Sequence, residues 1–392
     1  TGFTTGYENV AIGHQAGDAL TTGYQNVAVG NGALGVANDG YQNTAIGHLA
    51  MGNNATNAGN TNVAIGYRTM EEVNDGFANT YVGTLSGGSE GSVSGDYNVG
   101  VGYQADKTRI GGDYNISIGY RTNEYQGAGS GQYSIAIGRE ASKHYGRIAS
   151  GTYKQMGARI AIGVYAGAYM TSGDYSTIVG NNSYKGDQSV YNATASYVTT
   201  LGADAGFFAT GSYNTFVGAW AARGGQTSAP YSSGEYNVAI GVYALQNFTT
   251  GDKNIAIGPT ALGNVSTGYR NIGIGDRAAV GTTTGHSGVY IGYLAGYGGN
   301  QGGSVAIGAE ALYTANGGSN VAIGYESAKL TTSNDGVWIG ANAGKDGAGG
   351  GQSVIVGHYA GQYIVGNQVT HLGREAGRYA TGSYNTFVGV SA

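Results

Sequence analysis

The sequence contains no cysteine and only two prolines among 392 residues. Without cysteine, neither disulfides nor thiolate metal sites hold the fold together. The shortage of proline excludes a collagen triple helix, which also needs glycine at every third residue. Charged residues make up only 10%, with a net charge of −5, so neither sign is concentrated enough for a nucleic-acid interface. Apolar runs stay well below the roughly 18 residues of a membrane span, so we expect no direct membrane insertion by this segment.

Glycine, by contrast, accounts for 77 residues, and one short motif recurs from end to end. The octet at 9–16 (NVAIGHQA) returns at 26–33 as NVAVGNGA and at 43–50 as NTAIGHLA. With variation the motif occurs 22 times, mostly at spacings of 16 or 17 residues. Its glycines stand at 13, 30, 47, 66, 83, 102, 119, 138, 163, 180, 202, 218, 241, 258, 275, 292, 308, 324, 340, 357, 373 and 389.

Alignment of the repeats on this glycine gives columns of restricted composition. The positions one and three residues before it are always β-branched or leucine, which predicts one buried face of a strand. The position between them varies from alanine to tryptophan, so we expect it to face away from the core. The glycine should form a corner, and the position three after it is always Ala, Ser or Thr, which predicts close approach of another backbone. In the first two repeats the expected structural core is Val10, Ile12, Gly13, Ala16, Val27, Val29, Gly30 and Ala33.

These columns predict an all-β fold, a parallel β-solenoid or β-roll of about 22 coils with 16–19 residues in most coils. We expect a second short strand through the small-residue column, and one elongated repetitive domain over 1–392. Asparagine precedes the glycine by four residues in 13 of the repeats, and tyrosine often precedes that asparagine. Both columns should form ladders along the solenoid axis.

A coil this short encloses little volume, so a lone solenoid would leave much apolar surface exposed. This favours several chains packed around a shared axis, and we predict a homotrimer. A lone solenoid is the alternative.

The octet Asn-x-Ala-Ile-Gly-x-x-Ala resembles the head repeats of trimeric autotransporter adhesins. The longer form from Thr21 to Gly30, with Thr-Thr-Gly-Tyr-x-Asn before the core, is similar to repeats of phage tail fibres and related bacterial surface proteins. The resemblance implies a left-handed parallel β-roll, three chains, and attachment to a host surface. It also implies an extracellular location, on a virion tail fibre or a bacterial cell surface. We expect the chain to be a piece of a longer polypeptide.

Three repeat spacings, of 25, 22 and 23 residues, exceed all others and place inserted loops at 139–157, 181–197 and 219–236. Insertions in a solenoid emerge as loops, and loops often carry binding residues. Their aromatic and basic residues suit a glycan or a protein receptor. The alternative is that these loops are extensions without a ligand. The candidate binding residues are Tyr145, Arg147, Tyr153, Lys154, Tyr184, Tyr191, Trp220, Arg223 and Tyr231.

No motif in the chain predicts catalysis, a metal or another cofactor. The histidines are scattered; His14 and His48, two coils apart, would be about 10 Å from each other, too far to share a metal. The acidic pair Glu71 and Glu72 falls in a widened turn, and no calcium-binding nonapeptide recurs in register. We therefore predict a non-enzymatic fibre segment that makes multivalent contacts with a host or cell surface. A structural filament or spacer subunit is the main alternative, and a glycan depolymerase and an ice-binding solenoid are less favoured.

Overall fold

The computed structural model describes 14 stretches of the chain, which divide into two compact units, residues 1–200 and 201–392. Each unit is described by itself. The described residues are 5–35, 39–53, 59–72, 76–88, 95–108, 111–124, 132–143, 158–170, 173–186, 195–225, 232–299, 302–314, 317–347 and 349–392.

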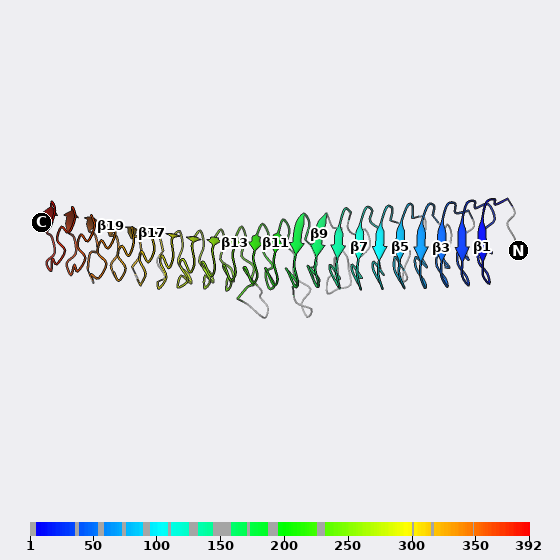
Figure 1. Cartoon of the computed structure of the whole chain (residues 1–392), viewed down its shortest axis with the longest axis horizontal. Helices are drawn as coiled ribbons and strands as arrows, with labels where there is room; N and C mark the ends of the chain where they lie inside the picture. Colours follow the sequence, from blue (N-terminus) through cyan, green and yellow to red (C-terminus); the bar gives the residue numbers. More distant parts are fainter. Residues whose placement is uncertain are drawn as a thin grey trace. The chain divides into compact units, whose positions relative to one another are not determined.

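The structure places one short strand in each repeat, and these described stretches contain no helix (Figure 1). The all-β parallel β-solenoid is therefore confirmed, with 22 strands for the 22 motifs. The first unit holds β1 (Val10–Ile12), β2 (Val27–Val29), β3 (Thr44–Ile46), β4 (Val63–Ile65), β5 (Thr80–Val82), β6 (Val99–Val101), β7 (Ile116–Ile118), β8 (Ile135–Ile137), β9 (Arg159–Ile162) and β10 (Ser176–Val179). β11 (Thr199–Leu201) runs across the division. The second unit holds β12 (Thr215–Val217), β13 (Val238–Ile240), β14 (Ile255–Ile257), β15 (Ile272–Ile274), β16 (Val289–Ile291), β17 (Val305–Ile307), β18 (Val321–Ile323), β19 (Val337–Ile339), β20 (Val354–Val356), β21 (Thr370–Leu372) and β22 (Thr386–Val388).

Within each unit, consecutive strands pair in parallel and in strict register. Val10 lies opposite Val27, and the middle residues Ala11 and Ala28 face each other in the same way. The register survives the longest spacing, because Ile137 in β8 still pairs with Ile162 in β9. Extra residues between motifs are therefore accommodated outside the paired strands.

The repeat glycine adopts a backbone conformation that other residues strongly disfavour. At Gly30, φ is +133°, and a Cβ added there would lie 2.5 Å from the carbonyl oxygen of Gly47 in the next coil. The glycine column thus allows successive coils to stack at the corner, as the sequence predicts.

The orientation of the strand residues is opposite to the expectation. The middle residue is buried, as Ala28, Ala45 and Ala64 show, whereas the flanking residues point outward. Val10 is 48% and Ile12 61% exposed, so their assignment to the core is wrong. Val27 and Val29 are only partly buried and lie on the same outer face. The physical reason is the narrow lumen of a 16- or 17-residue coil, which leaves no room for two β-branched side chains per strand.

In many coils the variable middle column is explained by compensation inside the coil. The position four residues after the repeat glycine also points into the lumen, and in these coils a small residue at one of the two positions accompanies a large residue at the other. The coil of β10 departs from this rule, because Ile178 and Tyr184 are both fully buried. The small Ala45 shares its coil with Met51, and the large Trp338 shares its coil with Gly344. A Cβ at Gly344 would lie 2.3 Å from Cδ1 of Trp338. A large ring is therefore tolerated inside because its opposite position is reduced to glycine. Other coils pair Ala28 with Leu34, Ala64 with Met70, Tyr81 with Gly87, Ala239 with Leu245, Tyr290 with Gly296 and His371 with Gly377.

The described residues show a turn, not a second strand, through the small-residue column. Residues two and four after the glycine have left-handed backbone, as at Leu49 (φ 54°) and Met51 (φ 50°). Alternating left-handed residues cannot form an extended strand. Ala33 is nevertheless fully buried and Ala16 packs against the same interior.

Both predicted ladders are present. Oδ1 of Asn9 accepts a hydrogen bond of 2.9 Å from the backbone N–H of Asn26, and Asn26 repeats this contact with Asn43. These buried amides satisfy backbone groups between coils. The tyrosine ladder is exposed, and the rings of Tyr7 and Tyr24 stack with centroids 5.0 Å apart.

Candidate binding surfaces

Two surfaces stand out as candidates for binding: aromatic and cationic clusters beside the long insertions, and an apolar stripe on the strands. Six of the predicted binding residues lie outside the described residues: Tyr145, Arg147, Tyr153, Lys154, Tyr191 and Tyr231. Tyr184 is fully buried, so its assignment to a binding loop is wrong. It stands four residues after Gly180, in the column that points into the lumen. Trp220 and Arg223 are partly exposed and lie together.

In the second unit, Trp220 and Arg223 form an aromatic and cationic cluster just before the insertion after β12. The guanidinium carbon of Arg223 lies 4.7 Å from the Trp220 ring and 5.0 Å from the Phe208 ring. Tyr243, from the next coil, packs against Trp220 with ring centroids 6.0 Å apart. No hydrogen-bond partner for Nε of Arg223 is present among the described residues. The stacking holds Arg223 in place through ring faces, which is a favourable arrangement for a guanidinium.

In the first unit, Tyr165 is the centre of a similar cluster next to the 139–157 insertion. Nζ of Lys185 lies 4.5 Å from the centroid of the Tyr165 ring, and the guanidinium carbon of Arg139 lies 5.4 Å from it. The two cations come from the coils before and after that of Tyr165. We call this set the Tyr165 cluster and the set around Trp220 the Trp220 cluster.

Both clusters follow one rule of position. Their central aromatic residue stands two after the repeat glycine, where the left-handed backbone turns the side chain outward; φ is 57° at Tyr165 and 60° at Trp220. Tyr165 is a residue that reasoning from loops alone missed, since it belongs to a coil of ordinary length. The sequence signal for such a cluster is an aromatic residue two positions after the repeat glycine together with a basic residue in a neighbouring coil.

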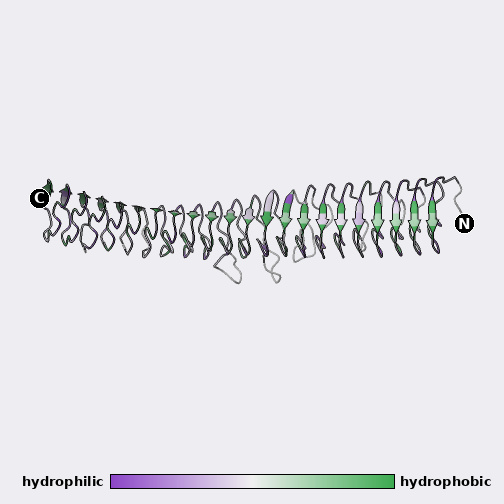
Figure 2. Cartoon of the chain, in the orientation of Figure 1, coloured by the Kyte–Doolittle hydropathy of each residue, from purple (hydrophilic) through white to green (hydrophobic). Residues whose placement is uncertain are grey.

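The apolar stripe consists of the outward-facing Val, Ile and Leu residues one and three before the repeat glycine, and seven coils have Thr at the position three before it. Within each unit these residues stack directly on one another through the parallel pairing, as Val321 and Ile323 do on Val337 and Ile339. Figure 2 shows mainly hydrophobic colouring along the strands. Ile323 remains 37% exposed, and its equivalents in most coils are similar. A contiguous apolar surface of this kind typically marks an interaction site.

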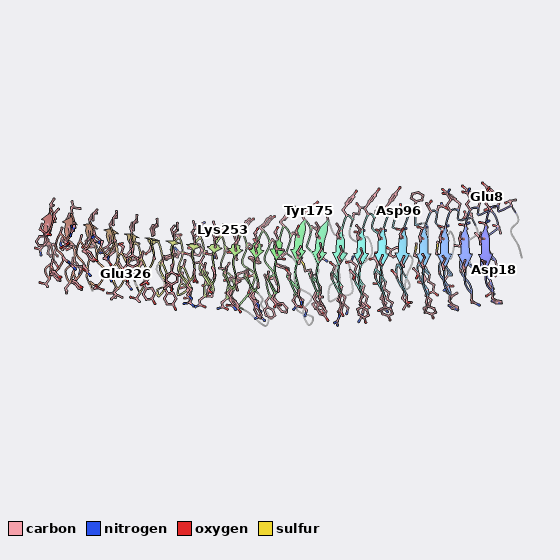
Figure 3. The ribbon with its side chains drawn as sticks, viewed as in Figure 1. Glu8, Asp18, Asp96, Tyr175, Lys253 and Glu326 are labelled. Atoms are coloured by element: carbon pink, nitrogen blue, oxygen red, sulfur yellow. The ribbon has the colours of Figure 1, made fainter. Side chains whose placement is uncertain are left out.

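Several charged residues near the turns form ion pairs within a coil or between neighbouring coils. Nζ of Lys329 contacts Glu310 and lies 2.6 Å from Glu326, which also pairs with Lys345 at 2.6 Å. Burial alone would raise the pKa of Glu326, but hydrogen bonds from Lys329 and Lys345 lower it. Hydrogen bonds to Glu310 and Glu326 raise the pKa of Lys329. Figure 3 places Glu326 on a different edge of the second unit from Lys253, which lies over the Tyr236 ring. These ion pairs therefore connect the coils of Glu310, Glu326 and Lys345.

The described residues contain no group of three or more His, Asp or Glu side chains that could hold a metal ion. His371 is fully buried, and its two ring nitrogens have no hydrogen-bond partner among the residues that the structure describes. Burial lowers the pKa of His371. A neutral, enclosed imidazole that fills the lumen opposite Gly377 serves packing.

No protein-family model and no curated protein matches the chain. Within the described stretches, no helix is long and apolar enough to cross a membrane.

Proposed function

We propose that the chain is a segment of an extracellular fibre that attaches to a host or cell surface by repeated weak contacts, without catalysis. The observation that carries this proposal is the pair of aromatic and cationic clusters beside the insertions. A solenoid is a rigid scaffold whose stability comes from contacts between neighbouring coils. Side chains such as Tyr165 and Trp220 are not needed to close the coil, since most repeats place smaller or polar residues in their column. Aromatic and arginine side chains on a rigid surface favour recognition of glycans or proteins.

The proposal includes assembly into a homotrimer through the apolar stripe. Stacked Val and Ile columns over many coils would give each copy a long, flat, hydrophobic face, and identical copies would cover it symmetrically. Three copies would present each cluster three times. Multivalency of this kind can raise apparent affinity about 100-fold or more over that of a single weak site.

The attachment proposal is tested by point variants that leave the lumen intact. We expect Tyr165→Ala and Trp220→Ala each to weaken binding of the purified chain to host or bacterial cells, and their combination to abolish it. The matched control is Tyr243→Phe, which retains the ring against Trp220 and should bind normally. Thermal unfolding must be unchanged in all variants. Full cell binding by the folded double variant would refute the proposal.

A purely structural spacer is the second candidate, and the ladders favour it. The asparagine and tyrosine ladders extend through coils that carry no insertion, so they connect coils whether or not a loop is present. Contacts of this kind are expected of a structural scaffold. A spacer predicts that no single surface residue affects attachment of the intact fibre. Binding to bacterial cells would favour a virion tail fibre, and binding to host cells would favour a bacterial surface protein.

A further inference from the structure

We propose that a shallow polar groove on the last four coils of the second unit binds a neutral, extended, β-1,4-linked glycan. The groove follows the two residues that precede the asparagine position, over the coils of β19 to β22. Its lining includes Asn334 and Asp335, Gln352, Asn367 and Gln368, and Tyr384 at one end. The inference rests on the proposed role in attachment, and it names a ligand class and a site that lie apart from the insertions.

The backbone fixes the direction of the amides in this groove. Oδ1 of Asn334 accepts a 2.8 Å hydrogen bond from the N–H of Gly318, and Oδ1 of Asn367 accepts one of 3.1 Å from Gly351. Each amide therefore has its acceptor occupied, while its NH₂ group has no partner among the described residues. Both side chains are exposed, so these NH₂ groups are oriented donors available to a ligand.

Gln352 and Gln368 add a second row beside the asparagines. Nε2 of Gln368 donates to Oε1 of Gln352 at 2.9 Å, which leaves the NH₂ of Gln352 and the carbonyl oxygen of Gln368 without a described partner. The groove thus offers hydrogen-bond donors and acceptors in alternation. The hydroxyl groups of a sugar can pair with both, because each hydroxyl donates and accepts. Tyr384 is exposed and supplies a ring face for the C–H face of a sugar.

The spacing of the donors specifies the shape of the chain. Asn334 and Asn367 lie two coils apart, which is about 10 Å at the usual spacing of paired strands. A β-1,4-linked hexopyranose chain is extended, and neighbouring sugars are turned over, so the same face recurs at every second sugar. An α-1,4-linked chain curls and cannot follow this line. Asp335 is the only acidic residue in the groove lining, and it disfavours anionic glycans.

Substitution of asparagine by aspartate tests the donors without disturbing the fold. Aspartate keeps the Oδ1 acceptor and replaces the NH₂ donor by a second oxygen. The fold already uses aspartate in this column, since Oδ1 of Asp252 accepts a 2.8 Å hydrogen bond from the N–H of Glu235. The matched control is Asn264→Asp on another face, where Oδ1 of Asn264 accepts from Asn247. It makes the same change in charge outside the groove.

The experiment is calorimetric titration of the full chain with cellohexaose, maltohexaose and a polygalacturonate hexamer. We expect cellohexaose alone to bind, and cellobiose to bind far more weakly because it cannot reach both asparagines. Asn334→Asp and Asn367→Asp should each weaken cellohexaose binding about tenfold, the loss expected for a good hydrogen bond. Asn264→Asp should bind like the wild type. Absence of cellohexaose binding, equal binding of maltohexaose, or retention of affinity in both groove variants would overturn the inference.

The two proposals fail separately. A chain that attaches to cells through Tyr165 and Trp220 but ignores cellohexaose overturns the groove and keeps the attachment proposal. A chain that binds cellohexaose through Asn334 and Asn367 but attaches to no surface refutes attachment and leaves the groove standing as a glycan site.

Discussion

The reciprocal sizes inside the coils predict that a lumen pair can be exchanged only as a pair. Trp338 is fully buried, and Gly344 lies against its indole ring. Replacing Trp338 by Ala should cost about 3–5 kcal/mol, the usual range for a buried tryptophan. The indole Nε1 has no hydrogen-bond partner among the described residues, so its loss relieves a penalty and places the value near the lower end. Gly344→Leu alone should cost more than about 1–3 kcal/mol, because its Cβ already overlaps the ring.

The double variant Trp338→Ala with Gly344→Leu recreates the pair that Ala239 and Leu245 form elsewhere in the same unit. Leu245 has a left-handed φ of 51°, so leucine is compatible with the backbone at this position. We expect the double variant to be more stable than the sum of the single changes predicts, by about 2 kcal/mol or more. Recovery should be incomplete, because the ring also fills space beside Gly336, which leucine does not reach.

Native-state hydrogen exchange resolved by mass spectrometry is the suitable assay. Stacked coils open locally, so a single melting temperature would average over many coils. Protection of the amides in β18, β19 and β20 should fall in each single variant and recover in the double variant. Additive losses, within about 0.5 kcal/mol, would refute compensation inside the coil.

Three further predictions concern charge, pH and assembly. Acid should destabilise the β21 coil, because burial lowers the pKa of His371 in the folded state. The contribution of neutral His371 to the free energy of unfolding is complete above its unfolded-state pKa of about 6.5. It is lost as the pH falls from there through the lowered folded-state pKa. Urea denaturation should therefore give a lower free energy of unfolding near pH 5 than near pH 7.5, and His371→Phe should abolish this difference. A difference that persists in His371→Phe would assign the pH dependence to other groups. Lys329→Met should cost about 0.5–1 kcal/mol in urea denaturation, because it removes the lysine that pairs with Glu310 and one of the two lysines that pair with Glu326, and high salt should shrink the loss. Ile323→Glu should convert a trimer to monomers in light scattering, and a trimer that persists would exclude the apolar stripe as the interface.

Much of this fold is predictable from the aligned columns. The β-branched positions mark each strand, as β2 at Val27–Val29 shows, and the glycine marks the corner. Both predictions rest on local backbone preferences, and the same residue types recur in every repeat. The ladders follow because parallel stacking places equal positions above one another, and the stack of Asn9 and Asn26 is an example.

The orientation of the strands was not predictable from composition alone. A strand with Val10 and Ile12 on one face and Ala11 on the other has the same period whichever face is inside. The deciding signal was nevertheless present in the sequence, since Ala45 occurs with Met51 and Trp338 with Gly344. Variation in one column that is compensated in another indicates an interior, whereas variation in one column alone suggests exposure.

The candidate binding surfaces were predictable only in part. Trp220 and Arg223 were found because the spacing breaks near them. Tyr165 was missed because its coil has ordinary length and its partners Arg139 and Lys185 come from the coils on either side. Tyr184 was misplaced because a loop boundary drawn from spacing cannot show which residues still belong to the coil.

The sizes of the lumen residues should also disfavour misalignment of the coils during folding. Because every strand presents nearly the same outer residues, a coil that skipped a neighbour would pair its backbone equally well. In the native order the coil of Gly273, against which Leu262 packs, separates Leu262 from the ring of Tyr290; a coil that skipped this neighbour would bring the two large side chains together. The lumen residues thus distinguish some coils from others by size, at positions that neither solvent nor a receptor contacts.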